Sequence, residues 1–208
     1  MTLPGEVRTG NTYDKYSSQH PVERALMARF LRTLDAAITG EVPSWIIEIG
    51  MGEGEIAMRL REAFPDALFA GIDLPTPVLA EHWTRRGLNG VVADACQLPF
   101  RDDSADLVLA IEVLEHLPDP ETALAEMARV GRGKVVLSVP LEPLWRVGNL
   151  ARRRYIKDWG NTPGHVNHFS RRSFVSLVGR HLDVRDVLRP LPWTLVVATV
   201  PTSTKVSF

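Results

Sequence analysis

The chain has 208 residues, with 24 Lys and Arg against 25 Asp and Glu, and 45% of its residues are hydrophobic. These values are typical of one globular domain spanning residues 1–208, and a single cysteine, Cys96, excludes an internal disulfide or a zinc site built from cysteines. No apolar run approaches 18 residues and the first six residues show no signal-peptide pattern, so we expect a cytoplasmic protein with no membrane partner.

The first predicted element is a helix that begins at Pro21. Apolar residues recur at positions 22, 26, 30 and 34, which is the spacing of one helix face, and Gly40 marks its end. We interpret residues 1–40 as an N-terminal region that caps the domain.

A strand and a glycine turn follow. The apolar run 46–49 contains one acidic residue, Glu48, and three glycines then alternate at Gly50, Gly52 and Gly54 before a helical pattern begins. Strand, glycine turn and helix N-terminus together let a backbone approach a nucleotide-like ligand closely. The spacing is Gly-x-Gly-x-Gly, because the third glycine of a dinucleotide fingerprint would fall at position 55, which is Glu55.

The next strand, residues 68–72, ends in a carboxylate at Asp73, followed by Leu74. A carboxylate at the tip of the second strand can accept hydrogen bonds from both hydroxyls of a ribose. This position therefore supports a nucleoside ligand without choosing between nicotinamide and other adenine-containing cofactors.

The passage from Val91 to Phe100, Val-Val-Ala-Asp-Ala-Cys-Gln-Leu-Pro-Phe, precedes a fourth apolar strand that ends at Ile111. A turn and a fifth strand, Val135–Pro140, come after it. With the glycine turn, these motifs resemble the class I S-adenosylmethionine (SAM)-dependent methyltransferases of small-molecule type, in the correct order from about Trp45 to Pro140.

The resemblance implies how SAM is bound. Gly50 and Gly52 allow close approach of the methionine moiety, Glu48 orients its ammonium, Asp73 binds the ribose, and Asp94 with the backbone after it binds the adenine. The cofactor-binding set that it implies is Glu48, Gly50, Gly52, Gly54, Asp73, Leu74, Asp94, Ala95, Ile111, Tyr13 and Tyr16, the two tyrosines belonging to a lid.

The remaining pattern predicts an α/β fold. Helices are expected at about 54–64, 76–86, 120–130, 143–156 and 171–180, alternating with strands as in a parallel sheet. The strands at 182–188 and 193–198 are too close for a helical crossover, so they must run antiparallel. The resemblance implies a Rossmann-like, mostly parallel sheet of seven strands in the order 3-2-1-4-5-7-6, with helices on both faces.

The resemblance implies that the segment after the fifth strand, residues 141–172, is an insert on the acceptor side. The segment from Glu142 to Arg172 contains seven Arg and Lys residues and two acidic residues. Its net charge is +5, which leaves −6 for the rest of the chain. Such a segment can attract an anionic substrate such as a phosphate, a carboxylate or a nucleic-acid backbone. The alternative is a solvated helix face, because apolar residues at 144, 147, 151 and 155 recur at helical spacing.

The candidates for a base that removes a proton from the acceptor are His168, His116 and His165. A metal site is an alternative interpretation, since Glu112, Glu115, His116 and His168 resemble the ligand set of the small-RNA 3′-end 2′-O-methyltransferases. The sequence departs from that family at Asn167, where the family has Asp, and the aromatic residue after Phe169 is missing.

Three functions remain open at the level of sequence. The first is SAM-dependent methyl transfer to an oxygen, nitrogen or carbon atom of a small molecule. The second is RNA methylation, against which stand the isoelectric point near 6.6 and the lack of an appended nucleic-acid domain. The third is a non-catalytic binding partner with the same fold, against which stand the intact acidic positions. We therefore expect a small-molecule acceptor and no nucleic-acid partner.

Overall fold

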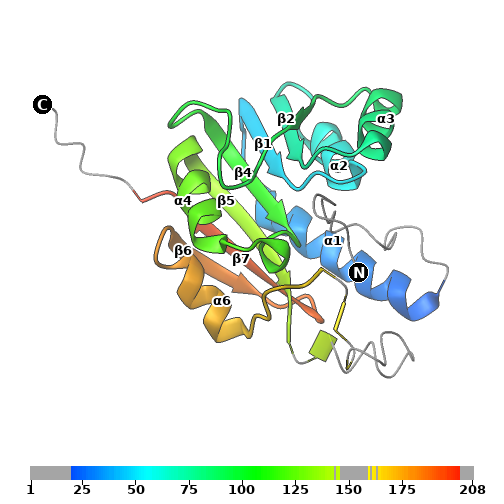
Figure 1. Ribbon diagram of the computed structural model, residues 1–208, viewed down its shortest axis with the longest axis vertical. Helices are drawn as coiled ribbons and strands as arrows, with labels where there is room; N and C mark the ends of the chain where they lie inside the picture. The colour runs from blue at the N-terminus through cyan, green and yellow to red at the C-terminus, as the bar shows by residue number, and fades with distance from the viewer. Residues whose placement is uncertain (1–19, 143, 146–158, 160, 163, 202–208) are drawn as a thin grey trace, which may run out of the picture.

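A computed structural model describes residues 20–142, 144–145, 159, 161–162 and 164–201. One sheet of seven strands runs through this part of the chain (Figure 1). Its strands are β1 (Trp45–Ile49), β2 (Leu68–Asp73), β3 (Gly90–Val92), β4 (Ala105–Ile111), β5 (Gly131–Pro140), β6 (Asp183–Leu188) and β7 (Trp193–Thr199). Its helices are α1 (Pro21–Ile38), α2 (Glu55–Ala63), α3 (Pro77–Arg86), the short 3-10 helix η1 (Leu114–His116), α4 (Pro120–Val130) and α6 (Arg171–Val178).

The strand order is β3-β2-β1-β4-β5-β7-β6, which confirms the predicted topology. The pairs from β3 to β5 are parallel, and β7 runs antiparallel to both β5 and β6. Because the carboxyl ends of parallel strands meet at one edge of a sheet, the turns after β1, β2, β3 and β4 are brought together there.

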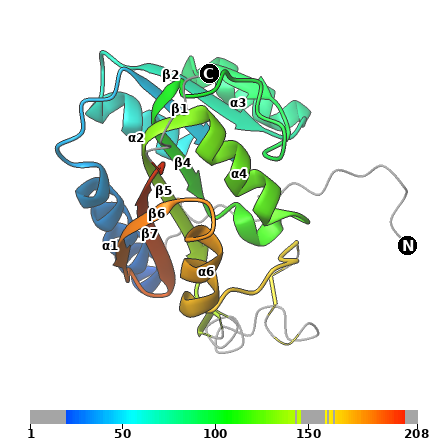
Figure 2. The ribbon, with the colours of Figure 1, turned by 90° about the vertical axis from the view of Figure 1, so that its left-hand side faces the viewer.

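Two apolar layers fill the space between the sheet and its helices. On one face Phe30 and Leu34 of α1 pack with Ile56 of α2, and on the other Leu124 of α4 packs with Phe174 of α6. Figure 2 shows α1 and the pair α4 and α6 on opposite sides of the sheet. Strand β4 and residues 135–140 of β5 are buried on both faces, as expected for the centre of such a sheet.

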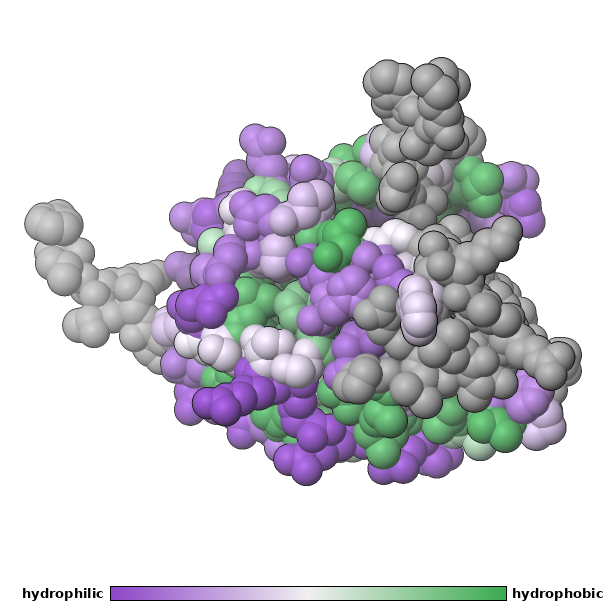
Figure 3. All heavy atoms as spheres, turned by 60° about the horizontal axis from the view of Figure 1, so that its bottom comes forward, coloured by the Kyte–Doolittle hydropathy of each residue, from purple (hydrophilic) through white to green (hydrophobic). Residues whose placement is uncertain are grey.

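Local signals set the helix starts. Thr76, Asp119 and Ser170 each accept a hydrogen bond from a backbone N–H in the first turn of the helix that follows, which satisfies a donor that the helix itself cannot pair. On the face shown in Figure 3, hydrophilic residues are interspersed with hydrophobic ones over the described surface. None of the described helices is long and apolar enough to cross a membrane.

The fifth strand begins earlier than its apolar pattern predicts. It starts at Gly131 rather than Val135, because β4 lies very close to its first residues. A Cβ atom at Gly133 would lie 2.3 Å from the carbonyl oxygen of Asp106, so glycine is required for this pairing. The helix predicted at 143–156 lies almost entirely outside the described residues.

Candidate active site

The turn after β1 is built from glycines in the left-handed region. Gly50, Gly52 and Gly54 have φ angles of 70°, 54° and 88°, which other residues rarely adopt. A Cβ atom at Gly50 would lie 2.4 Å from Cγ2 of Val113, so the turn also packs tightly against the segment after β4. Gly54 forms the N-cap of α2 and directs the helix N-terminus toward the same edge of the sheet.

Glu48 places a carboxylate inside the protein at the end of β1. Its side chain is only 2% exposed, and among the described residues its Oε2 atom has no hydrogen-bond partner. Burial raises the pKa of Glu48 well above its ordinary value, and the nearby charge of Asp73 raises it further. A buried acceptor without a partner is costly, so this carboxylate is suited to a cationic ligand group that completes its hydrogen bonding.

Asp73 joins the turns after β1 and β2. Its Oδ2 accepts a hydrogen bond from the Gly52 backbone N–H at 2.7 Å, and its Oδ1 accepts one from the Leu74 N–H at the same distance. Burial raises the pKa of Asp73, while these two hydrogen bonds oppose the rise because they stabilise the charged form. The carboxylate is therefore held in a fixed orientation at the edge where a ribose is predicted to bind.

Trp83 also supports the glycine turn, although the sequence analysis did not single it out. Its indole Nε1–H donates to the carbonyl oxygen of Gly52 at 2.8 Å. The ring lies against Gly90, where a Cβ atom would come within 1.9 Å of it. The only signal in the sequence is an aromatic residue on the inner face of a helix, which usually indicates core packing alone.

The turn after β3 carries Asp94 and Ala95. The exposed carboxylate of Asp94 accepts a hydrogen bond from the Cys96 backbone N–H at 2.8 Å, and Ala95 is buried below it. The pKa of the Cys96 thiol is raised to about 11, mainly by burial. The charges of Asp94 and Asp119 raise it further. A thiol that stays protonated is a poor nucleophile, so Cys96 has a packing role here.

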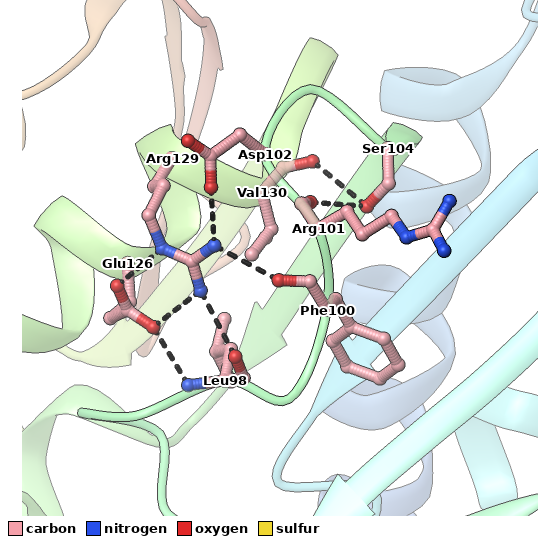
Figure 4. A network of polar contacts seen from close by, with 8 residues as sticks. All are labelled: Leu98, Phe100, Arg101, Asp102, Ser104, Glu126, Arg129 and Val130. Carbon is pink, nitrogen blue, oxygen red and sulfur yellow. Dashed lines mark hydrogen bonds and ion pairs between the residues drawn. The ribbon is translucent and has the colours of Figure 1, made fainter.

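Arg129 of α4 fastens the chain that follows this turn (Figure 4). Its guanidinium donates to the carbonyl oxygens of Leu98 and Phe100 at 3.0 and 2.9 Å. It also pairs with the carboxylates of Glu126 and Asp102, each at 2.6 Å. One side chain thus fixes a loop that lies about 30 positions earlier in the sequence.

The end of β4 lies close to residues that flank the predicted acceptor-side insert. Ile111 is buried, and Glu112 has a φ of 58°, an uncommon conformation for a residue other than glycine. The Trp193 indole N–H donates to Oε1 of Glu112 at 2.6 Å. The Trp193 ring in turn contacts Phe30 and Trp145, with centroid distances of 5.0 and 5.5 Å.

The three candidate histidines divide into two groups. His116 and His165 contact each other edge to face with ring centroids 4.8 Å apart, while His168 lies with its Nε2 atom 2.8 Å from Oδ1 of Asn161. Glu115, His116 and His165 bring potential metal-ligand atoms within 4.8 Å of one another. The structure thus keeps Glu115 and His116 of the four ligands predicted from sequence together, adds His165, and places Glu112 against Trp193 and His168 against Asn161.

The lid tyrosines Tyr13 and Tyr16 lie outside the described residues, as do Arg152, Arg153 and Arg154 of the basic insert. Their roles remain predictions from the sequence. The described residues that flank the insert include Trp145, whose Nε1–H donates to Oγ1 of Thr162 at 2.9 Å.

Comparison with known proteins agrees with this arrangement. Residues 47–138 match a family model described as a methyltransferase domain. The malonyl-[acyl-carrier protein] O-methyltransferase of Geobacter sulfurreducens is 33% identical over 122 residues, which are 57% of this chain and 44% of that protein. The demethylmenaquinone methyltransferase of Thermus thermophilus is 33% identical over 129 residues, which are 58% of each chain.

Residues 47–138 thus form a methyltransferase domain that is similar to those of the class I SAM-dependent methyltransferases. The chain spans about half the length of the curated relatives that it matches. A crystal structure of a protein from Pyrococcus horikoshii has the same fold, with a TM-score of 0.70 over 91% of this chain and 95% of that one, at 16% identity.

The residues present fit the cofactor of this family. SAM carries an ammonium and a sulfonium, and the site offers two buried or half-buried carboxylates, Glu48 and Asp73. The partnerless Oε2 atom of Glu48 and the left-handed glycine turn beside it provide an acceptor and a backbone without side chains in the way.

Proposed function

We propose that the chain uses SAM to methylate a small-molecule acceptor at the carboxyl ends of β1 to β5. The observation that carries this proposal is the pairing of Asp73 with the Gly52 and Leu74 N–H groups beside the buried Glu48 carboxylate. This pairing orients one carboxylate for ribose hydroxyls and leaves another for an ammonium.

The cofactor supplies a methyl group that is already activated by the positively charged sulfur. The protein therefore has to position the acceptor in line with that methyl and, for a hydroxyl or enol, accept a proton. His116, His165 and His168 all lie near the end of β4 or in the segment that crosses it, and they are our candidates for the proton-accepting base.

The acceptor class follows from the surroundings of this site. Trp145 packs against the buried Trp193 next to the Glu112 carboxylate, and the sequence of the adjoining insert is basic. These features support a partly apolar, anionic small molecule. The two curated relatives carry names with different acceptors, a malonyl group on a carrier protein and demethylmenaquinone, so we propose the class and not a particular compound.

Calorimetric titration of the chain with SAM, with its demethylated product and with NAD tests the proposal. We expect SAM and the product to bind and NAD to give no heat. Asp73→Ala should weaken SAM binding at least about tenfold, because charge-assisted hydrogen bonds to the ribose are lost.

Glu81→Ala is the matched control, since Glu81 is an exposed carboxylate on α3 that pairs with Arg85. It should leave SAM affinity within about twofold of the original protein. Because Asp73 also supports two turns, Asp73→Asn and the melting temperature of each variant separate loss of the ligand contact from loss of the fold. Unchanged SAM affinity in a folded Asp73→Ala variant contradicts the role given to this residue.

A further inference from the structure

Glu115, His116 and His165 form a compact cluster beside the proposed acceptor position. Glu115 and His116 belong to η1, and His165 comes from a segment about 50 positions later. One ligand atom from each side chain lies within 4.8 Å of the others. Glu115 is 2% exposed and His165 is 9% exposed, so the cluster is largely shielded from water. Two imidazoles and one carboxylate are a donor set that suits borderline divalent metals such as Zn²⁺, Mn²⁺, Fe²⁺ or Co²⁺.

We propose that Glu115, His116 and His165 bind one divalent transition-metal ion. Metal–ligand bonds of about 2.0–2.2 Å place the ligand atoms of a shared ion roughly 3–4 Å apart. Separations of up to 4.8 Å therefore have to shorten by about 1–2 Å, which rotations of the imidazole rings and of the Glu115 side chain provide. Three protein ligands leave coordination positions for water or for an oxygen of a bound molecule.

The hydrogen bonding of His116 supports this assignment. Its Nδ1 atom lies 3.0 Å from the carbonyl oxygen of Gly164. A carbonyl oxygen only accepts hydrogen bonds, so in the neutral ring Nδ1 carries the proton and Nε2 carries the lone pair. This is the arrangement found for most metal-binding histidines, whose second nitrogen donates to a carbonyl or carboxylate.

The backbone around the cluster is fixed before any ion binds. The N–H groups of Val166 and Asn167 both donate to the carbonyl oxygen of Glu115, at 2.9 and 3.0 Å. The side-chain amide of Asn167 donates to the carbonyl oxygens of Leu114 and Leu117, at 3.1 and 2.6 Å. Four hydrogen bonds thus hold η1 against the segment that carries His165. Ligands held in this way lose little conformational freedom on binding a metal.

The cluster also borders the proposed cofactor site. Val113, the residue that precedes η1, packs against the glycine turn after β1, because a Cβ atom at Gly50 would lie 2.4 Å from its Cγ2 atom. If the proposed function holds, an ion at this position would lie on the acceptor side of the cofactor. It would lower the pKa of an acceptor hydroxyl or enol that coordinates it.

The test uses the full chain, without an affinity tag, after treatment with a chelator and in the absence of SAM. Calorimetry with Zn²⁺ should show one ion per chain with micromolar or tighter affinity. Co²⁺ should give visible absorption bands of an ion ligated by nitrogen and oxygen. His165→Gln should weaken Zn²⁺ binding about 100-fold or more, since one of three protein ligands is lost.

His181→Gln is the matched control, because His181 also pairs with a carboxylate, that of Glu121, but lies away from the cluster between α4 and α6. It should leave Zn²⁺ affinity unchanged. His168→Gln distinguishes the neighbouring histidine, and loss of binding in that variant with retention in His165→Gln would overturn the proposed ligand set. Absence of stoichiometric Zn²⁺ and Co²⁺ binding in the original chain would overturn the site itself.

A rise in the melting temperature of the original chain with Zn²⁺ provides a measurement that needs no variant, because an ion that binds only the folded state stabilises it. The SAM titration is independent of these results. Metal binding without SAM binding would contradict the proposed function alone, and SAM binding without metal binding would contradict only this inference.

Discussion

The two halves of the proposed active site are built in different ways. We call the carboxyl ends of β1, β2 and β3, with the turns that follow them, the cofactor edge. We call the carboxyl ends of β4 and β5, with η1 and the described residues from 161 to 169, the acceptor edge. At the cofactor edge the key contacts join the end of a strand to its own turn or to the turn of the neighbouring strand. Asp73 at the end of β2, for example, accepts hydrogen bonds from Leu74 and from Gly52, which lies 21 positions away.

At the acceptor edge the partners are far apart in the sequence. Glu112 meets Trp193 across 81 positions, and His116 meets Gly164 across 48. The cofactor edge therefore follows from local turn geometry repeated along a parallel sheet. The acceptor edge depends on how a separate segment is laid across the end of β4. This difference predicts that substitutions in one edge leave ligand binding at the other nearly unchanged.

The largest effect is expected at Arg129, where the cofactor edge itself depends on a distant contact. Arg129→Met removes the hydrogen bonds to Leu98 and Phe100 and leaves the Glu126 carboxylate, which is 19% exposed, without this partner. We expect the free energy of unfolding to fall by about 2–4 kcal/mol. Urea denaturation measures it.

Arg85→Met is the control for Arg129→Met. Arg85 forms a surface ion pair with Glu81 in which both side chains are about two-thirds exposed, so its loss should cost less than about 1 kcal/mol. Equal destabilisation by the two substitutions would show that the loop after β3 does not need Arg129.

Glu48→Gln tests the cofactor edge, because it should stabilise the ligand-free chain and weaken SAM binding. The folded-state pKa of Glu48 lies above its ordinary value of 4.5, because the folded state holds the proton more tightly than the unfolded state. The contribution of this protonated side chain to stability is therefore fully present below pH 4.5. That contribution is lost as pH rises through the folded-state pKa. We expect Glu48→Gln to raise the free energy of unfolding of the ligand-free chain by roughly 1–2 kcal/mol at pH 8, with the gain vanishing toward pH 4.5.

The same variant should bind SAM at least about tenfold more weakly, because the carboxylate that meets the ammonium is gone. Urea denaturation at several pH values and calorimetry with SAM measure the two effects. A stability difference that does not change with pH would contradict the burial of an ionisable carboxylate as its cause.

The smallest effect on SAM affinity is expected at Asn167, in the acceptor edge. Asn167→Ala removes two hydrogen bonds that hold η1, at 3.1 and 2.6 Å, and should lower the free energy of unfolding by about 1–2 kcal/mol. SAM affinity should stay within about twofold, since the cofactor edge is built separately. Asn89→Ala, which loses one long contact of 3.5 Å, is the control and should change stability less. A large loss of SAM affinity in Asn167→Ala would show that the two edges are coupled.

The fold and the cofactor edge could be predicted because their signals are local. Buried strands ending in glycines or carboxylates recur at the spacing of βα units, and the short gap between residues 188 and 193 requires an antiparallel pair. The beginning of β5 was missed, since Gly131 and Gly133 carry no apolar pattern and are needed for close approach of β4. Trp83 was missed because its contact with Gly52 comes from a helix 31 positions away.

By itself, the sequence placed Glu48, Asp73 and Asp94 at the ends or turns of β1, β2 and β3, and its resemblance to a known family implied the order of the seven strands. A parallel sheet brings those turns together whatever the loops contain. Only the tertiary structure decided whether His165 or His168 lies beside His116. The two histidines are three positions apart, and both were candidates in the sequence. The N–H groups of Val166 and Asn167 bind the carbonyl oxygen of Glu115, and this places His165 against His116 and His168 against Asn161. Such a choice rests on hydrogen bonds between segments about 50 positions apart, which no local spacing encodes.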